Sequence, residues 1–293
     1  MKIFISGGTG FVGGHLRMAL LERGHQLRLL VHGRKEQEGP GVELVEGDVT
    51  RPETFAGAAQ GCDAVINLVG IIREFPGRGI TFEKHHVEAT RAMVATARQA
   101  GIKRYLQMSA LGTRPHATSD YHRTKFRAEE IVRASGLDWT IFRPSLIFGP
   151  GDAFVNMLAG FIKSLPAVPV IGDGNYRLQP ISVDDVASCF AMALDMPDTA
   201  GKTYELCGRD RFTYNDMLDA IGKVLGRSRV SKIHNPLGFM RLIVPVLQGI
   251  PFFPLTMDQI TMLIEENIGE MNWTETFGFE PQGFVEGIGR YLK

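Results

Sequence analysis

The sequence is poor in cysteine, and this scarcity limits the kinds of site that it can build. Its 293 residues include only Cys62, Cys189 and Cys207, which lie far apart in the chain. This spacing excludes a disulfide framework and a CxxC metal motif, and it favours a reducing compartment. His85 and His86 lack a second ligand pair at metal spacing, so we expect no metal site. No signal-peptide pattern precedes the first strand-like run, and we expect a cytoplasmic protein.

Excess charge and long apolar runs are also missing. Lys plus Arg and Asp plus Glu both total 32, so no overall field attracts nucleic acid, and we expect no nucleic-acid partner. The most apolar stretch, 236–257, is interrupted by Arg241 and four prolines. A membrane-spanning helix needs about 20 consecutive apolar residues. We therefore expect no transmembrane span, while contact of 236–257 with a protein or with the inner face of a membrane stays open.

Glycine, by contrast, is plentiful and occurs at informative positions near the start of the chain. The run 2–6 is typical of a buried strand, residues 11–23 of an amphipathic helix, and residues 26–31 of a second strand. Gly7, Gly10 and Gly13 lie at the junction of the first strand and the helix. In this context, glycines allow a tight turn, a close approach of main-chain amides to a pyrophosphate, and close packing of helix on strand. The junction therefore predicts a dinucleotide-binding turn.

The end of the second strand indicates which dinucleotide is preferred. NAD sites usually carry an acidic residue there, which accepts a hydrogen bond from the ribose 2′-hydroxyl. No Asp or Glu occurs between Glu22 and Glu36, and His32, Arg34 and Lys35 are found instead. Basic side chains suit a 2′-phosphate, so the sequence favours NADP(H), with NAD(H) as the alternative.

Strands and helices continue to alternate along the chain. We expect strands over 42–48, 63–70, 103–110 and 138–144, and helices over 52–60, 80–101 and 121–135. Such alternation predicts an α/β fold with a doubly wound parallel sheet, a Rossmann fold. Ligands of these sheets bind at the carboxyl ends of the strands. The candidate cofactor-binding residues at or near those ends are Gly7, Thr9, Gly10, Phe11, Val12, Gly13, His32, Arg34, Lys35, Asp48, Val49, Leu68, Val69, Gly70, Ser109, Tyr121, Lys125, Pro144, Ser145 and Ile147.

Tyr121 and Lys125 form the candidate reactive pair. They are four residues apart at the start of a predicted helix, and therefore on one face of it. An ammonium near a phenol lowers the phenol pKa, which would make Tyr121 a usable acid or base near neutral pH. Lys125 could also hydrogen-bond the nicotinamide ribose. An ordinary exposed pair is the alternative interpretation.

Several motifs together resemble the short-chain dehydrogenase/reductase superfamily in its extended or atypical branch. They are GGTGFVG, GDV at 47–49, NLVG at 67–70, YxxxK and FRPSLIFGPGD at 142–152. Within that superfamily, INLVGIIRE, FEKHHVEAT, MSALGT and QPISVDDVA are similar to bacterial relatives of the 39-kDa accessory subunit of respiratory NADH:ubiquinone oxidoreductase. The resemblance implies a Rossmann domain that binds NADP(H), with a small C-terminal lid. In the respiratory complex this relative is a structural subunit.

The sequence departs from the sugar epimerases of this branch in the half that binds substrate. Leu178 stands where they carry a diphosphate-binding arginine, and Arg177 is one residue early, which on a strand means the opposite face. Their substrate-holding hydroxyl falls at Leu111, flanked by Ser109 and Thr113. We take Ser109 as a candidate catalytic residue beside Tyr121 and Lys125.

We expect two domains. Residues 1–150 and 179–207 form the dinucleotide-binding domain, and 151–178 with 208–293 form a smaller α+β substrate or lid domain. The first functional hypothesis is an NADP-preferring oxidoreductase acting on a carbonyl or alcohol. The alternatives are a non-catalytic NADPH-binding protein of a respiratory or quinone-related assembly, and a nucleotide-sugar epimerase or dehydratase. The sequence does not decide between turnover and binding alone, nor does it identify the substrate.

Overall fold

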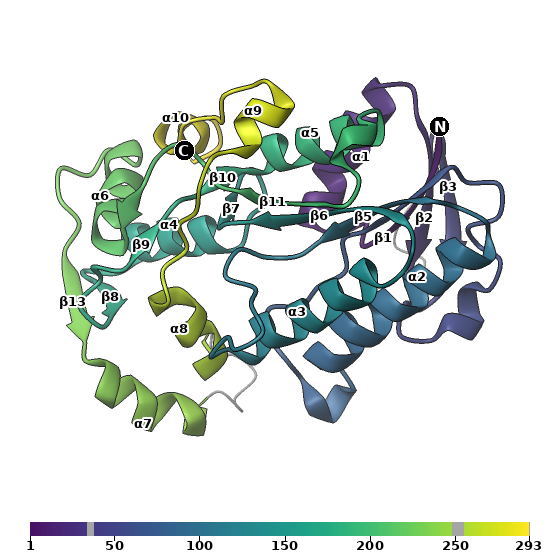
Figure 1. Ribbon diagram of the computed structural model, residues 1–293. Helices are drawn as coiled ribbons and strands as arrows, with labels where there is room; N and C mark the ends of the chain where they lie inside the picture. Colours follow the sequence, from purple (N-terminus) through teal and green to yellow (C-terminus); the bar gives the residue numbers. More distant parts are fainter. Residues whose placement is uncertain (34–37, 248–254, 293) are drawn as a thin grey trace. The chain divides into compact units, whose positions relative to one another are not determined.

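The computed structural model describes residues 1–33, 38–247 and 255–292, and the chain divides into two compact units (Figure 1). The first unit comprises Met1–Pro144 and Asp184–Glu205, and the second comprises Ser145–Val183 and Leu206–Lys293. Three short segments of the predicted dinucleotide-binding domain, 145–150, 179–183 and 206–207, fall in the second unit by this division.

The first unit is built on a seven-stranded sheet in the order β11-β6-β5-β4-β1-β2-β3. Neighbouring strands from β3 to β6 pair in parallel, as expected for a doubly wound sheet, and the predicted fold class is confirmed. The central strands are apolar because both of their faces are covered. The strands are β1 (Lys2–Ser6), β2 (Gln26–Val31), β3 (Val42–Glu46), β4 (Ala64–Asn67), β5 (Arg104–Met108), β6 (Asp138–Pro144) and β11 (Lys202–Leu206).

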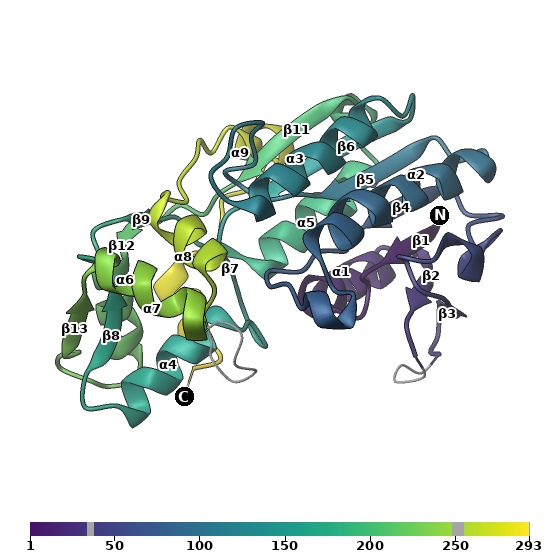
Figure 2. The ribbon, with the colours of Figure 1, turned by 90° about the horizontal axis from the view of Figure 1, so that it is seen from below.

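Helices cover both faces of this sheet. Helices α1 (Phe11–Glu22) and α5 (Val183–Leu194) lie on one face, and α2 (Ala89–Gln99) and α3 (Asp120–Arg133) lie side by side on the other (Figures 1 and 2). A hydrogen bond of 2.7 Å between His15 and Asp184 links α1 to α5. The buried layer under α2 and α3 includes Phe4, Met93 and Tyr105.

Two predicted helices differ from the structure. Residues 52–60 form a single 3₁₀ turn, η1 (Pro52–Phe55), followed by turns. Gly57 and Gly61 both have φ +74°, a left-handed conformation that stops a helix. The predicted helix 80–101 begins with a π-helical turn, η3 (Glu83–Glu88), before α2 continues it.

The second unit has short strands and several helices. Its strands are paired as β10 with β7, β12 with β9, and β13 with β8, where β7 is Ile147–Phe148, β8 Val168–Ile171, β9 Arg177–Leu178, β10 Ile181–Ser182, β12 Phe212–Thr213 and β13 Lys232–Asn235. The helices are α4 (Phe154–Ser164), α6 (Tyr214–Val224), α7 (Leu237–Leu247), α8 (Met257–Ile264), α9 (Trp273–Phe277) and α10 (Phe284–Gly289). Along β9, Arg177 is exposed and Leu178 is buried, so the two side chains occupy opposite faces as expected.

The apolar stretch 236–257 contains α7, and its residues 248–254 lie outside the described residues. Within the part of the chain that the structure describes, no helix combines the length and the hydropathy that crossing a bilayer requires.

Candidate active site

The glycine turn between β1 and α1 has the geometry of a cradle. Gly7 has φ +74°, and its carbonyl accepts a hydrogen bond of 3.1 Å from the Gly10 amide. A Cβ added at Gly13 would lie 2.4 Å from the Gly7 carbonyl oxygen, which real Cβ atoms do not tolerate. The helix begins at Phe11 without an acidic residue in its first turn. Its amino-terminal amides and their partial positive charge are therefore suited to an anionic group.

The turn after β4 packs directly against this cradle. Asn67, the last residue of β4, is fully buried, and its Oδ1 accepts hydrogen bonds from the Ser6 hydroxyl (2.8 Å) and the Val69 amide (3.1 Å). A Cβ on Gly7 would lie 3.0 Å from the Leu68 carbonyl carbon. The predicted segment Leu68–Gly70 therefore lies beside the glycine turn, at the carboxyl ends of two adjacent parallel strands.

Of the predicted cofactor residues that follow β2 and β3, the structure describes His32, Asp48 and Val49. His32 is exposed directly after β2. The pKa of Asp48 lies below its ordinary value, although burial alone would raise it. The Thr50 amide and hydroxyl each donate a hydrogen bond of 2.8 Å to its carboxylate, and these bonds, together with the charges of His32 and His85, lower the pKa. Asp48 is therefore a carboxylate at neutral pH. The other two predicted residues, Arg34 and Lys35, lie outside the described residues.

Lys125 is the most unusual ionisable group of the site. Its side chain is 2% exposed. Its Nζ donates hydrogen bonds to the carbonyls of Val69 and Met108, at 3.3 Å each. These two bonds link the ends of β4 and β5. Burial lowers the pKa of Lys125 to about 8, although the charge of Glu129 opposes this shift. A buried amine with a pKa near neutrality is typical of functional sites.

Tyr121 lies one turn before Lys125 on α3, in a buried aromatic cluster. Its ring meets those of Phe82 and His86 edge-on, with centroids 5.8 and 5.2 Å away. Ser119 caps the helix by accepting a hydrogen bond from the His122 amide. This cap fixes the first turn of α3 and hence the direction of the Tyr121 side chain.

His86 belongs to the site, although from the sequence it was notable only as one of two adjacent histidines without the spacing of a metal site. The π-helical turn η3 carries it, and the ring stacks on Phe82. Its Nδ1 shares a hydrogen bond of 2.9 Å with the Thr124 hydroxyl, and its Nε2 lies 3.1 Å from the Ile71 carbonyl. Burial and then the charge of Lys125 lower the pKa of His86 to about 2, so the ring is neutral. It ties α3 to the segment after β4, and π turns frequently occur at such sites.

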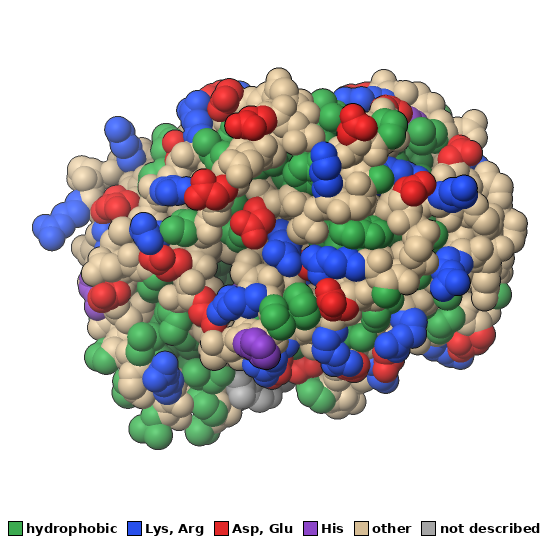
Figure 3. Space-filling view, in the orientation of Figure 1, with side chains coloured by type: hydrophobic (Ala, Val, Ile, Leu, Met, Phe, Trp, Pro, Cys, Tyr) green, Lys and Arg blue, Asp and Glu red, His purple; other side chains and the backbone are tan. Residues whose placement is uncertain are grey.

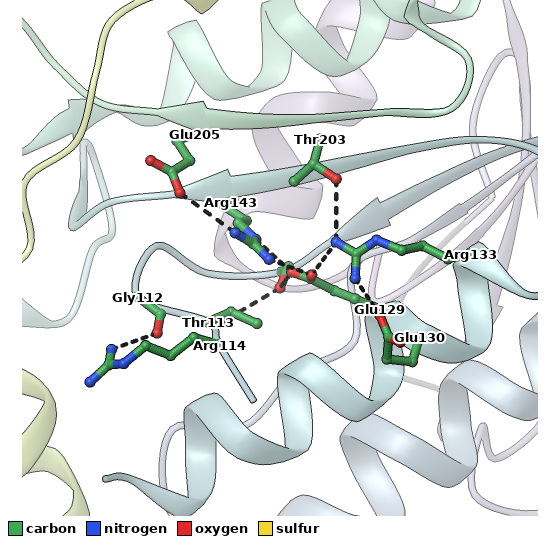
Figure 4. Close-up of polar contacts among 10 residues, drawn as sticks. Gly112, Thr113, Arg114, Glu129, Glu130, Arg133, Arg143, Thr203 and Glu205 are labelled. Carbon is green, nitrogen blue, oxygen red and sulfur yellow. Dashed lines mark hydrogen bonds and ion pairs between the residues drawn. The ribbon is translucent and has the colours of Figure 1, made fainter. Parts of the chain in front are cut away.

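Ser109 is hydrogen-bonded to Glu129, which Figure 4 shows in a cluster of charged groups with Arg133 and Arg143. Its hydroxyl donates to Glu129 Oε1 at 2.6 Å. Glu129 is fully buried and receives two hydrogen bonds from Arg143, at 2.8 and 2.7 Å, and a third from Arg133 at 2.7 Å. The hydroxyl would have to leave Glu129 before it could polarise a substrate oxygen.

The remaining predicted cofactor residues follow β6. Pro144 ends that strand, and its carbonyl accepts from the Leu111 amide at 2.9 Å. Ser145 and Ile147 belong to the second unit, where the Ser145 hydroxyl donates to the Gln179 carbonyl at 2.5 Å. In the described chain, no group of three or more His, Cys, Asp or Glu side chains could hold a metal ion.

Curated relatives include a respiratory subunit and a reductase. The chain is 34% identical over 228 residues to the mitochondrial NADH dehydrogenase [ubiquinone] 1 alpha subcomplex subunit 9 of Arabidopsis thaliana. The aligned region covers 73% of this chain and 56% of that protein. The chain thus spans little more than half the length of that relative. It is 30% identical over 240 residues to the ceramide reductase of Caulobacter vibrioides, covering 80% of this chain and 74% of the reductase.

Solved structures share the fold at low identity. The UDP-glucose 4-epimerase of Thermotoga maritima with UDP-glucose has a TM-score of 0.77 at 18% identity, covering 100% of this chain and 97% of that one. The Thermus thermophilus UDP-glucose 4-epimerase complex with NAD has a TM-score of 0.76 at 19% identity, covering 100% and 98%. These matches show that the chain shares this fold. The model of a family described as NAD(P)H-binding matches residues 7–197, and the chain therefore belongs to this NAD(P)H-binding family.

Proposed function

We propose that this protein is an NADP(H)-preferring oxidoreductase that interconverts a carbonyl and an alcohol. The observation that supports it most is Lys125, a buried amine with a pKa of about 8, one helical turn after Tyr121 and at the carboxyl edge of a Rossmann sheet. A lysine that served only as a surface ion pair would not be buried in this way. A relative named as a reductase supports the same reaction class.

The residues that are present fit the cofactor, because Gly13 lets α1 begin directly against the backbone of Gly7 and Gly8, and the first turn of α1 carries no acidic residue that would repel a pyrophosphate. The amides of the glycine turn would bind the pyrophosphate, and Leu68–Gly70 would line the cofactor between the two strand ends. When bound, NADP(H) supplies or accepts a hydride at the nicotinamide C4. In reduction, Tyr121 gives its hydroxyl proton to the substrate oxygen while the carbonyl carbon gains the hydride, and in oxidation the proton returns. Lys125 stabilises the Tyr121 phenolate.

The test compares Tyr121→Phe with the parent protein. Kinetics would be measured on a panel of ketones with NADPH, beginning with long-chain substrates because one relative is a ceramide reductase. We expect kcat to fall by about 10²–10⁴-fold, as for loss of general acid–base catalysis. The Kd of the variant for NADPH should stay within about threefold of the parent's, because the phenol does not hold the pyrophosphate. Full activity of the variant would overturn the proton-transfer role.

The preference for NADP(H) depends on the basic residues after β2. Replacing Arg34 and Lys35 by serine should raise the Kd for NADPH by about tenfold, or roughly 1.4 kcal/mol, and leave that for NADH unchanged. An equal effect on both coenzymes would contradict the assignment of the 2′-phosphate to these residues.

The second candidate is a binding protein in which NADPH is a fixed structural ligand. It is favoured by the Ser109 hydroxyl, which is engaged by Glu129, and by relatives that are named as respiratory subunits. Identification of the copurifying nucleotide by mass, followed by measurement of its exchange with added NADPH, separates the two functions. Exchange over hours without turnover of any ketone supports binding alone, and exchange within seconds supports catalysis.

A further inference from the structure

Helix α7 of the second unit is apolar on two opposite sides. Leu237, Met240 and Val244 form the inner side, which packs with Ile260 of α8. Figure 2 shows α7 and α8 side by side. This contact accounts for one stripe of the helix, with the spacing i, i+3, i+7 that a packed helix face requires.

The outer stripe of α7 is exposed. Phe239, Leu242 and Val246 have the same spacing, i, i+3, i+7, and are 53%, 73% and 77% exposed. Successive residues of a helix are separated by about 100°, which places this stripe on the side opposite the inner one. Figure 3 shows hydrophobic side chains gathered over α7, with a basic side chain among them. A contiguous apolar surface of this kind marks an interaction site.

The charge of the surrounding sequence indicates what covers the stripe. The whole chain is neutral, but residues 220–247 contain five Lys or Arg and no Asp or Glu. The five are Lys223, Arg227, Arg229, Lys232 and Arg241. Lys232 is paired with Asp219 at 2.6 Å, whereas Arg227, Arg229 and Arg241 are exposed. Over this stretch of sequence, the exposed apolar side chains of α7 are accompanied by cations and by no acidic residue, and the next acidic residue, Asp258, belongs to α8. Apolar side chains combined with cations are what binds anionic lipid surfaces.

We propose that the outer face of α7 docks on the surface of an anionic bilayer, with Phe239, Leu242 and Val246 inserted below the headgroups. The helix lies in the interface and does not span it, since α7 has 11 residues and the bilayer core requires about 20. Arg241, between the two stripes, extends its guanidinium to lipid phosphates. This inference goes beyond the proposed function and does not depend on it, because no coenzyme or substrate takes part in it.

The experiment measures cosedimentation of the full chain with sucrose-loaded vesicles. Vesicles of phosphatidylcholine alone are compared with vesicles that contain phosphatidylglycerol as well. We expect binding to the anionic vesicles, at least about tenfold weaker binding to the neutral ones, and weakening of the anionic binding as salt is added. Failure to bind either vesicle overturns the proposal, and equal binding to both overturns its electrostatic part.

Two variants distinguish docking through α7 from nonspecific hydrophobic adsorption to vesicles. Leu242→Gln with Val246→Gln should reduce the vesicle partition coefficient by about tenfold or more, because two inserted apolar side chains are lost. Val285→Gln, at another exposed apolar position of the same unit, should leave it unchanged. Unchanged NADPH affinity and circular dichroism show that both proteins are folded. If the double variant instead abolishes self-association in sedimentation velocity and the parent ignores vesicles, a second copy covers the stripe and the proposal is wrong.

Discussion

In the first unit, β1 and β4 are buried along almost their whole length, and the side chain of the buried Asn67 is hydrogen-bonded to Ser6 and Gln107. In the second unit the strands have two to four residues, and α7 leaves a row of apolar side chains exposed. The first unit thus places ionisable groups at fixed positions around one sheet edge. The second covers less of its apolar surface by itself and is suited to contact with something outside it.

The largest effect of a single substitution on coenzyme binding is expected at Gly13, in the glycine turn of the first unit. Gly13→Ala should abolish coenzyme binding, with a loss of at least about 100-fold or roughly 3 kcal/mol, because the new Cβ would lie 2.4 Å from the Gly7 carbonyl oxygen and displace the turn. Titration with NADPH followed by fluorescence measures the loss. Gly14→Ala is the control, since among the described residues its Cβ would have nothing within 4 Å. Equal binding by both variants would show that the turn does not hold the coenzyme.

A comparably large effect, on stability instead of binding, is expected at the buried carboxylate of Glu129. Glu129→Gln leaves Arg143 and Arg133 without their shared anion and should destabilise the protein by about 3–5 kcal/mol. Glu130→Gln removes the exposed partner of the same Arg133 and should cost about 0–1 kcal/mol. Urea unfolding of the two variants measures the difference. Similar losses would mean that burial of Glu129 contributes nothing.

The strands of the first unit could be predicted closely from the sequence, whereas the groups around Glu129 and His86 could not. Strands 26–31 and 138–144 are short runs rich in apolar residues with clear ends, and the structure reproduces those bounds. Glu129 is bonded by Ser109 and Arg143, which are distant in sequence, and no local pattern reports such a contact. His86 is carried by a π turn, which has one more residue per turn than an α-helix. The pattern of apolar residues in the sequence does not reveal such a turn.

A smaller effect, dependent on pH, is expected at His86. Its folded-state pKa is lowered from 6.5 to about 2, so between these values the unfolded chain binds a proton that the folded chain does not. Stability must therefore fall as the pH falls below 6.5, by about 1.4 kcal/mol per pH unit from this group, or roughly 2 kcal/mol at pH 5. His86→Gln should flatten this slope, and His116→Gln, at an exposed histidine, should retain it. Urea unfolding at pH 7 and pH 5 provides the comparison, and parallel slopes for all three proteins would contradict the buried neutral state.

The smallest effect is expected in the second unit, at the pair formed by Arg177 and Glu266. Its two hydrogen bonds, 2.8 and 2.9 Å, are nearly as short as those of Arg143 to Glu129, so hydrogen-bond length alone predicts a comparable contribution. The side chains, however, are 51% and 36% exposed, and water screens their attraction and solvates either one when the other is removed. Arg177→Gln should therefore cost about 0–1 kcal/mol, most of it lost in salt above about 0.5 M. A loss near that of Glu129→Gln would show that hydrogen-bond geometry rather than burial sets the strength of these pairs. The contrast between the two units would then have to be explained by something other than solvent access.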